Sequence, residues 1–199
     1  MNKAALAGAL FRIGALRFGR FTLASGKTSS YYLDLRVVPS YPDVYSSVIR
    51  AYMKLAKALG SSEFDVVAGV ATAGVTFSSP LAYLMKKPMV YVRSEEKGHG
   101  LGRRIEGAVR PGIRALVVDD LVTTGGSMLG AIEALRGQGC RVTDALVLVD
   151  RQEGGAANLL GKGVRLHPFT NVRELVDVVY SDKKVTKKEH AAVLRQVES

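Results

Sequence analysis

The sequence has few of the residues that cross-link small folds or bind zinc. Its 199 residues include one cysteine, Cys140, and three histidines. A single cysteine cannot form an intrachain disulfide, and one thiol with three imidazoles argues against a structural zinc site. A chain of this length can bury a core without such cross-links. We therefore expect a single domain over residues 1–199 that folds in a reducing cytosol.

Acidic residues are also scarce relative to basic ones. Eighteen Asp and Glu against 28 Lys and Arg give a formal net charge of +10. Such an excess suits nucleic acid, an anionic membrane or a small polyanion such as a phosphate ester. The sequence contains no run of four or more basic residues, which weakens the case for a nucleic-acid-binding segment.

The sequence lacks an unbroken apolar segment that could serve as a signal or a membrane span. The apolar stretch at residues 4–11 is followed by three arginines rather than by a small-residue cleavage site. Residues 66–85 carry no charge, but glycine, proline and hydroxyl side chains interrupt them. We expect a soluble, cytoplasmic protein.

Apolar periodicity predicts alternating helices and strands. Helices are expected over residues 3–16, 41–59, 78–86, 127–136, 172–179 and 187–197, and strands over 64–70, 89–93, 115–119 and 145–149. Residues 18–38 are expected to form short strands and turns. Continuous apolar strands alternating with helices predict an α/β fold with a mostly parallel central sheet flanked by helices.

The most informative segment is a predicted strand, loop and helix over residues 115–136. The strand is apolar and ends in Asp119 and Asp120, and Thr-Thr-Gly-Gly-Ser follows at residues 123–127. Ligands of parallel sheets bind beyond the carboxyl ends of the strands, and free amides at a helix start favour a phosphate. Carboxylates repel phosphate but suit sugar hydroxyls or a metal held by a diphosphate. The segment therefore predicts a ligand that carries both a phosphate and a vicinal diol.

Other phosphate-binding loops do not fit this segment. It contains neither the Gly-Lys-[Ser/Thr] of a P-loop nor a Gly-x-Gly-x-x-Gly fingerprint. An ordinary helix cap beside two surface acids is the alternative, and the adjacent acids followed by Thr-Thr-Gly-Gly-Ser make it the weaker one.

The same segment resembles the phosphoribosyl-diphosphate (PRPP) binding motif of type I phosphoribosyltransferases. The resemblance implies that the two acids hold the ribose hydroxyls, that Asp120 is also catalytic, and that the loop cradles the 5-phosphate. The PRPP-binding residues that it implies here and in the earlier turn are Asp119, Asp120, Leu121, Val122, Thr123, Thr124, Gly125, Gly126, Ser127, Thr72 and Ala73. Some family members carry a lysine at the position of Ala73.

Residues 18–34, FGRFTLASGKTSSYYLD, resemble the amino-terminal signature of orotate phosphoribosyltransferases. Aromatic faces, hydroxyls and a cation suit a flat anionic pyrimidine. Taken alone, the segment would be a turn-rich edge hairpin. The resemblance implies that Lys27, Tyr31 and Tyr32 contact orotate, with Lys27 standing in for a lysine that some members have at Ala24.

Glycines and charges over residues 94–108 predict a mobile, exposed loop. The order of Arg93, Lys97 and His99 is similar to the family's catalytic loop, and implies that these residues bind the diphosphate of PRPP. Lys97 and His99 are then the catalytic residues that stabilise the departing charge. In the family this loop reaches the neighbouring subunit, which implies a homodimer. The alternative is a solvated charged loop without a function.

Asp-Arg-Gln-Glu follows the last predicted strand at residues 150–153. In the family such a stretch supplies the arginine that binds the orotate carboxylate, and a planar guanidinium suits a carboxylate. The resemblance therefore implies that Arg151, together with Thr123, binds orotate. A surface ion pair between Arg151 and Glu153 is the alternative.

The resemblance as a whole implies an orotate phosphoribosyltransferase of pyrimidine (UMP) biosynthesis. Such an enzyme converts orotate and PRPP to orotidine 5′-monophosphate and diphosphate with Mg²⁺, which PRPP itself mainly holds, with Asp119 or Asp120 as possible ligands. Residues 1–40 would contribute a base-binding hood. The alternatives are a purine phosphoribosyltransferase and a DNA-binding regulator with this fold that responds to PRPP or a base. No nucleic-acid or membrane partner is expected.

Overall fold

The computed structural model describes residues 2–22, 26, 28–60, 63–94 and 104–198. The chain divides into two compact units, one of Met1–Val48 with Thr170–Ser199 and one of Ile49–Phe169. The expected organisation, a single domain with a hood from residues 1–40, stays a prediction.

The larger unit is built on a six-stranded sheet with the strand order β5-β4-β3-β6-β7-β8. Its strands are β3 (Val66–Val70), β4 (Met89–Val92), β5 (Ile105–Glu106), β6 (Ala115–Val122), β7 (Asp144–Asp150) and β8 (Arg165–Asn171). Strands β4, β3, β6 and β7 pair in parallel, and β5 is antiparallel to β4. The predicted α/β fold with a mostly parallel sheet is confirmed.

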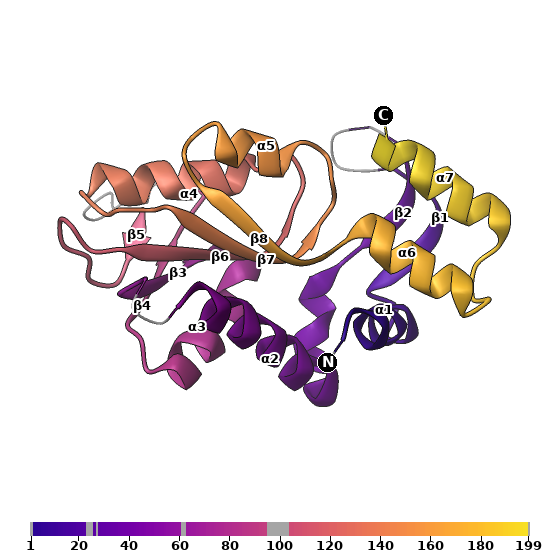
Figure 1. The fold of residues 1–199 in the computed structure, drawn as a ribbon, viewed down its shortest axis with the longest axis horizontal. Helices are drawn as coiled ribbons and strands as arrows, with labels where there is room; N and C mark the ends of the chain where they lie inside the picture. Colours follow the sequence, from indigo (N-terminus) through magenta and orange to yellow (C-terminus); the bar gives the residue numbers. More distant parts are fainter. Residues whose placement is uncertain (1, 23–25, 27, 61–62, 95–103, 199) are drawn as a thin grey trace. The chain divides into compact units, whose positions relative to one another are not determined.

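Helices cover both faces of this sheet (Figure 1). Helices α4 (Gly126–Gly137) and α5 (Gly155–Leu160) lie on one face, and α3 (Ala73–Met85) lies on the other with α2 (Pro42–Leu59). All residues of β3 are buried, as are the central residues of β7. Burial on both faces explains why the strands are continuous apolar runs rather than alternating ones.

The smaller unit contains a two-stranded antiparallel sheet and helices from both ends of the chain. Its elements are α1 (Lys3–Arg12), β1 (Leu16–Thr22), β2 (Thr28–Leu33), the 3-10 helix η1 (Leu35–Ser40), α6 (Val172–Ser181) and α7 (Lys187–Glu198). The Gln196 side chain of α7 accepts hydrogen bonds from the backbone N–H and the hydroxyl of Ser30, both at 2.8 Å. Lys3 of α1 pairs with Glu174 of α6 at 2.7 Å.

Several boundaries differ from those predicted. Helix α1 ends at Arg12 rather than at residue 16, because Gly14 turns the chain with φ 72° before β1 begins. Helix α3 begins at Ala73 instead of residue 78, and β6 continues through the two acids to Val122. The sequence analysis missed β5, α5 and β8. Two of these are too short for a periodic pattern to develop, and β8 contains His-Pro in its middle.

No helix in the described part of the chain is long and apolar enough to cross a membrane.

The close contact of α3 with β6 depends on Gly74. A β-carbon at this position would lie 2.6 Å from the Val118 carbonyl oxygen and 2.9 Å from Asp119 Oδ1. Because a backbone atom cannot yield as a flexible side chain does, we expect Gly74→Ala to lower the free energy of unfolding by about 1–3 kcal/mol. Urea denaturation measures the change.

Gly137→Ala is the matched control, because a β-carbon there meets no atom within 4 Å. Alanine is the better helix former, so this variant should be as stable as the parent or more stable by up to about 1 kcal/mol. Equal stability of the Gly74→Ala variant and the parent would show that α3 does not need the close approach.

Candidate functional site

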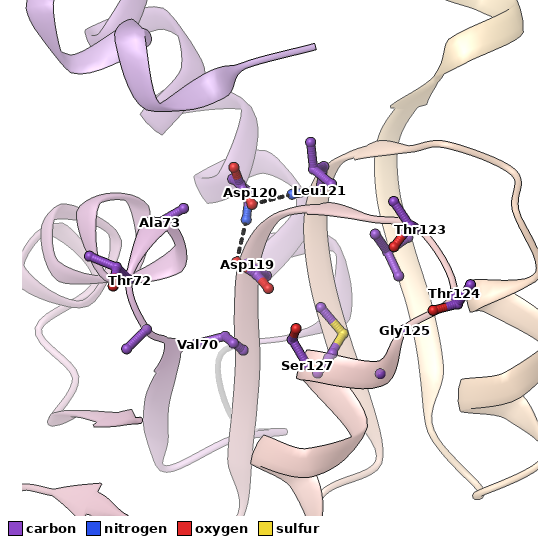
Figure 2. A pocket seen from close by; sticks show the side chains of 14 residues that line it. Val70, Thr72, Ala73, Asp119, Asp120, Leu121, Thr123, Thr124, Gly125 and Ser127 are labelled. Carbon is purple, nitrogen blue, oxygen red and sulfur yellow. Dashed lines mark hydrogen bonds between the residues drawn. The ribbon is translucent and has the colours of Figure 1, made fainter. Parts of the chain in front are cut away.

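A cavity of about 330 Å³ lies where the carboxyl ends of β3 and β6 meet (Figure 2). It is lined by two segments, Val70–Ala73 and Asp119–Met128. Because β3 and β6 are parallel neighbours, the loops that follow them emerge at the same edge of the sheet. The structure thereby brings together the predicted PRPP-binding residues of both segments: Thr72, Ala73, Asp119, Asp120, Leu121, Val122, Thr123, Thr124, Gly125, Gly126 and Ser127.

Asp119 is a buried carboxylate, with 9% of its surface exposed. Its Oδ1 accepts a hydrogen bond from the Asp120 N–H at 2.9 Å, and Asp120 Oδ1 accepts one from the Leu121 N–H at 2.8 Å (Figure 2). Burial, and secondly the charge of Asp120, raise the pKa of Asp119 well above its usual value. A ligand that donates hydrogen bonds or brings positive charge to this pair would relieve the cost of ionising it.

Tyr52 of α2 holds the backbone at the acid pair, and it lies within the helix that apolar periodicity predicts over residues 41–59. Its hydroxyl donates a hydrogen bond to the Asp119 carbonyl at 2.7 Å, and its ring stacks on Phe77 with centroids 5.7 Å apart. The side chain is fully buried, and this burial raises the pKa of the Tyr52 hydroxyl. An amphipathic aromatic residue within a helix pattern is the only sequence signal for such a role.

The loop after β6 leads into helix α4, whose first backbone amides are not capped by a side chain. Gly125 has φ 85° and precedes α4, and no side chain caps the amides at the start of that helix. These first amides have no intrahelical acceptor, and the helix dipole favours an anion beside them. The Ser127 hydroxyl lies on the same rim of the cavity (Figure 2). This end of the cavity is suited to a phosphate and the acid end to hydroxyl groups.

Arg151 follows β7 directly, next to the end of β6. Its backbone N–H donates a hydrogen bond to the Val122 carbonyl at 2.9 Å. Its side chain is only 11% exposed and lies 2.8 Å from a Glu153 carboxylate oxygen. The ion pair with Glu153 therefore exists, but it is largely buried on the Arg151 side. Binding of orotate by Arg151 stays a prediction.

Three predicted residues, Lys27, Lys97 and His99, lie outside the described residues, as does most of the predicted loop at 94–108. Arg93 is described at the end of β4, where its backbone N–H donates to the Arg104 carbonyl at 2.8 Å and its guanidinium lies 3.6 Å from Glu106. Its contact with a diphosphate stays a prediction.

The two predicted orotate-binding tyrosines belong to β2 of the smaller unit. Tyr31 is almost fully buried. Tyr32 is half-buried, and the Arg17 guanidinium lies over its ring at 5.0 Å from the centroid. A cation held over an aromatic face is compatible with binding a flat anion nearby, and the two contacts with orotate stay predictions.

The raised pKa of Asp119 predicts a pH-dependent stability. In the unfolded chain the pKa is about 3.9, so the folded protein holds this proton more tightly and loses stability as the pH rises above about 4. Asp119→Asn removes this loss and keeps a carbonyl oxygen for the Asp120 N–H. We expect the variant's gain in free energy of unfolding to grow between pH 4 and pH 8.

Denaturation with urea at several pH values measures this gain. Glu133→Gln removes an exposed carboxylate of α4 and controls for the change in net charge. A gain that stays constant or shrinks as the pH rises would contradict the electrostatic description of Asp119.

Known proteins share both the sequence and the fold. The model of the phosphoribosyl transferase domain matches residues 42–159. The orotate phosphoribosyltransferase of Cenarchaeum symbiosum is 43% identical over 186 residues, which are 93% of this chain and 91% of the relative.

Two solved structures are similar over most of the chain. The orotate phosphoribosyltransferase of Aeropyrum pernix superimposes with a TM-score of 0.77 and 35% identity, covering 88% of this chain and 99% of that one. The UMP synthase of Leishmania donovani gives a TM-score of 0.85 and 34% identity over 98% of this chain, which spans 42% of that longer protein. Because the family model covers more than half of the chain and these relatives are similar over most of it, the chain belongs to the phosphoribosyltransferase family and, within it, to the orotate phosphoribosyltransferases.

Proposed function

We propose that this protein transfers the 5-phosphoribosyl group of PRPP to orotate, giving orotidine 5′-monophosphate and diphosphate in pyrimidine (UMP) biosynthesis. The observation that carries the proposal is one cavity in which two carboxylates adjoin an uncapped helix start. PRPP has the matching groups, a ribose diol and a 5-phosphate. The similarity to orotate phosphoribosyltransferases over nearly the whole chain supports orotate as the base.

Each part of PRPP has a complementary part of the site. The amides and hydroxyls of residues 123–127 bind the 5-phosphate, and Asp119 and Asp120 accept hydrogen bonds from the ribose hydroxyls. Thr72 and Ala73, across the cavity, offer backbone groups to the diphosphate, which Arg93, Lys97 and His99 also contact.

The chemical step needs positioning and charge stabilisation rather than a covalent nucleophile. The bond from the anomeric carbon to the diphosphate breaks as the bond to the orotate nitrogen forms, through an oxocarbenium-like state. Carboxylates near the ribose, with Asp120 among the catalytic residues, favour positive charge on the sugar. Lys97 and His99 stabilise negative charge on the departing diphosphate.

Arg151 binds the orotate carboxylate, and Thr123 contributes to the base site. The planar guanidinium group of Arg151 matches the geometry of a carboxylate, as its pair with Glu153 shows. The low exposure of the Arg151 side chain strengthens such a contact, because water screens it less.

Mg²⁺ fits this site as a partner of the substrate rather than as a resident ion. Asp119 and Asp120 can add oxygen ligands to an ion that the diphosphate carries. When bound, Mg²⁺ neutralises the diphosphate as it leaves.

The enzyme acts as a homodimer in the cytoplasm, with the loop at 94–108 reaching the partner's site. The comparisons do not favour a purine phosphoribosyltransferase or a DNA-binding regulator.

The assay of this function mixes the protein with PRPP, Mg²⁺ and orotate, and follows the absorbance of the base. We expect orotate to be consumed and diphosphate to be released in equal amounts, while adenine or hypoxanthine is not consumed. Removal of Mg²⁺ with EDTA should abolish the reaction, and added Mg²⁺ should restore it. Consumption of a purine alone would refute the proposal, and salt-sensitive retention of duplex DNA without turnover would favour a regulator.

Arg151→Lys tests the base site, because lysine keeps the charge but loses the planar pair of donors. We expect the KM for orotate to rise about 10- to 100-fold, equivalent to about 1.4–2.8 kcal/mol, with the KM for PRPP nearly unchanged. Steady-state kinetics with each substrate varied in turn measure both constants.

Arg114→Lys is the control, because Arg114 makes a similar pair with Asp65, at 2.7 Å, before the amino end of β6. Its kinetic constants should stay those of the parent. A rise in the KM for PRPP alone in the Arg151→Lys variant would remove Arg151 from the orotate site.

A further inference from the structure

The segment that follows β7 holds three consecutive carbonyl groups, those of Val122 at the end of β6 and of Thr123 and Thr124 in the loop at 123–127. The Arg151 N–H donates to the Val122 carbonyl and the Gly155 N–H to the Thr123 carbonyl, both at 2.9 Å. The third donor is a side chain, since Asn158 Nδ2 donates to the Thr124 carbonyl at 2.9 Å. The hydrogen bonding between β6 and β7 thus continues beyond the strands through the N–H groups of Arg151 and Gly155. The last of these hydrogen bonds comes from the Asn158 side chain.

Helix α5 lies directly against this loop. A β-carbon on Gly155 would lie 2.5 Å from the Thr123 carbonyl oxygen, so only glycine permits this contact. Leu159 is fully buried and anchors the helix beneath the loop. The Asn158 backbone is therefore fixed, and its side chain reaches the Thr124 carbonyl from a rigid support.

The Thr124 carbonyl belongs to the peptide that joins Thr124 to Gly125. Because a trans peptide is planar, a donor that fixes this carbonyl also fixes the direction of the Gly125 N–H. Gly125 has φ 85° and no side chain caps the helix that follows, so the loop receives no support from its own cap. Asn158 supplies a side-chain hydrogen bond to the backbone of this loop, at the Thr124 carbonyl.

We propose that Asn158 is a positioning residue for the 5-phosphate of PRPP. Its carboxamide holds the Thr124 peptide so that the loop amides keep the orientation that the phosphate requires. Asn158 itself contacts no substrate, and the inference rests on the proposed binding of the 5-phosphate by residues 123–127. A neutral donor suits this place, because a carboxylate would face the Thr124 carbonyl oxygen and would repel the nearby phosphate.

The test compares Asn158→Ala and Asn158→Asp with the parent and with Leu160→Ala. Leu160 lies on the same short helix, is 66% exposed, and has no part in the loop contacts, so it controls for truncation of α5. Calorimetry measures binding of ribose 5-phosphate, which carries the phosphate and diol without the diphosphate. Steady-state kinetics measure kcat and both KM values.

We expect Asn158→Ala to weaken ribose 5-phosphate binding and to raise the KM for PRPP about three- to tenfold, as the loss of one neutral hydrogen bond predicts. Asn158→Asp should weaken both at least as much. The KM for orotate at saturating PRPP, the kcat and the midpoint of thermal unfolding should stay near the parent values. Leu160→Ala should match the parent in every measurement.

Three results would overturn the inference. The first is parental affinity for ribose 5-phosphate in the Asn158→Ala variant. The second is a fall in thermal stability with equal losses for both substrates, which would mean that Asn158 only stabilises α5. The third is a parent protein that does not bind ribose 5-phosphate. That result would overturn the assignment of the loop to the phosphate and this inference with it, whereas the first two leave the loop assignment standing.

Discussion

The burial of the Asp119 carboxylate beside Asp120 is the constraint on which the site depends. Two acids at consecutive positions of a strand repel each other, and burial adds to the cost of ionising the inner one. The fold accepts this cost and fixes the pair in place, through the Tyr52 hydroxyl on the Asp119 carbonyl and the close approach of Gly74. A ligand with a diol, or a cation carried by that ligand, meets two carboxylates in a preformed geometry. The free energy that the unliganded protein loses by burying these carboxylates is recovered in part when a ligand with hydroxyl groups or positive charge binds to them.

The end of the cavity at residues 123–127 has no charged side chains, unlike the end formed by the two acids. None of the described residues that line the cavity is basic, so what it offers to an anion is backbone amides, hydroxyls and the dipole of α4 rather than lysine or arginine. The net charge of +10 is therefore a poor guide to this part of the site. Backbone N–H groups need no side-chain rearrangement to bind an anion. They bind it well only while their peptide planes keep the orientation that points the N–H groups at the anion. This explains why the support of the loop from outside the cavity matters.

The sequence predicted those parts of the site that are continuous along the chain. The acids and the loop at 123–127 form one local pattern, and the parallel pairing of apolar strands places Thr72 and Ala73 opposite them. Tyr52 and Asn158 were not predicted, because each acts through one hydrogen bond to a backbone carbonyl distant in sequence. Such a contact leaves no periodicity or spacing. The extension of β6 to Val122 was missed for a related reason, since pairing with β7 outweighs the low strand preference of two aspartates.

The segment from Arg151 to Asn158 connects the proposed orotate subsite with the proposed phosphate subsite. It begins with the arginine assigned to the orotate carboxylate and ends with the carboxamide that holds the phosphate loop. Between them, the Gly155 N–H ties the segment to the Thr123 carbonyl, where no larger residue fits. The distance between the arginine proposed to bind the base and the loop proposed to bind the phosphate is therefore set by one short stretch of chain. Transfer requires the orotate nitrogen to meet the anomeric carbon while the phosphate stays bound. A rigid connection between the two proposed subsites would hold the orotate nitrogen at a fixed distance from the anomeric carbon. Neither subsite then needs to contact the reacting atoms directly.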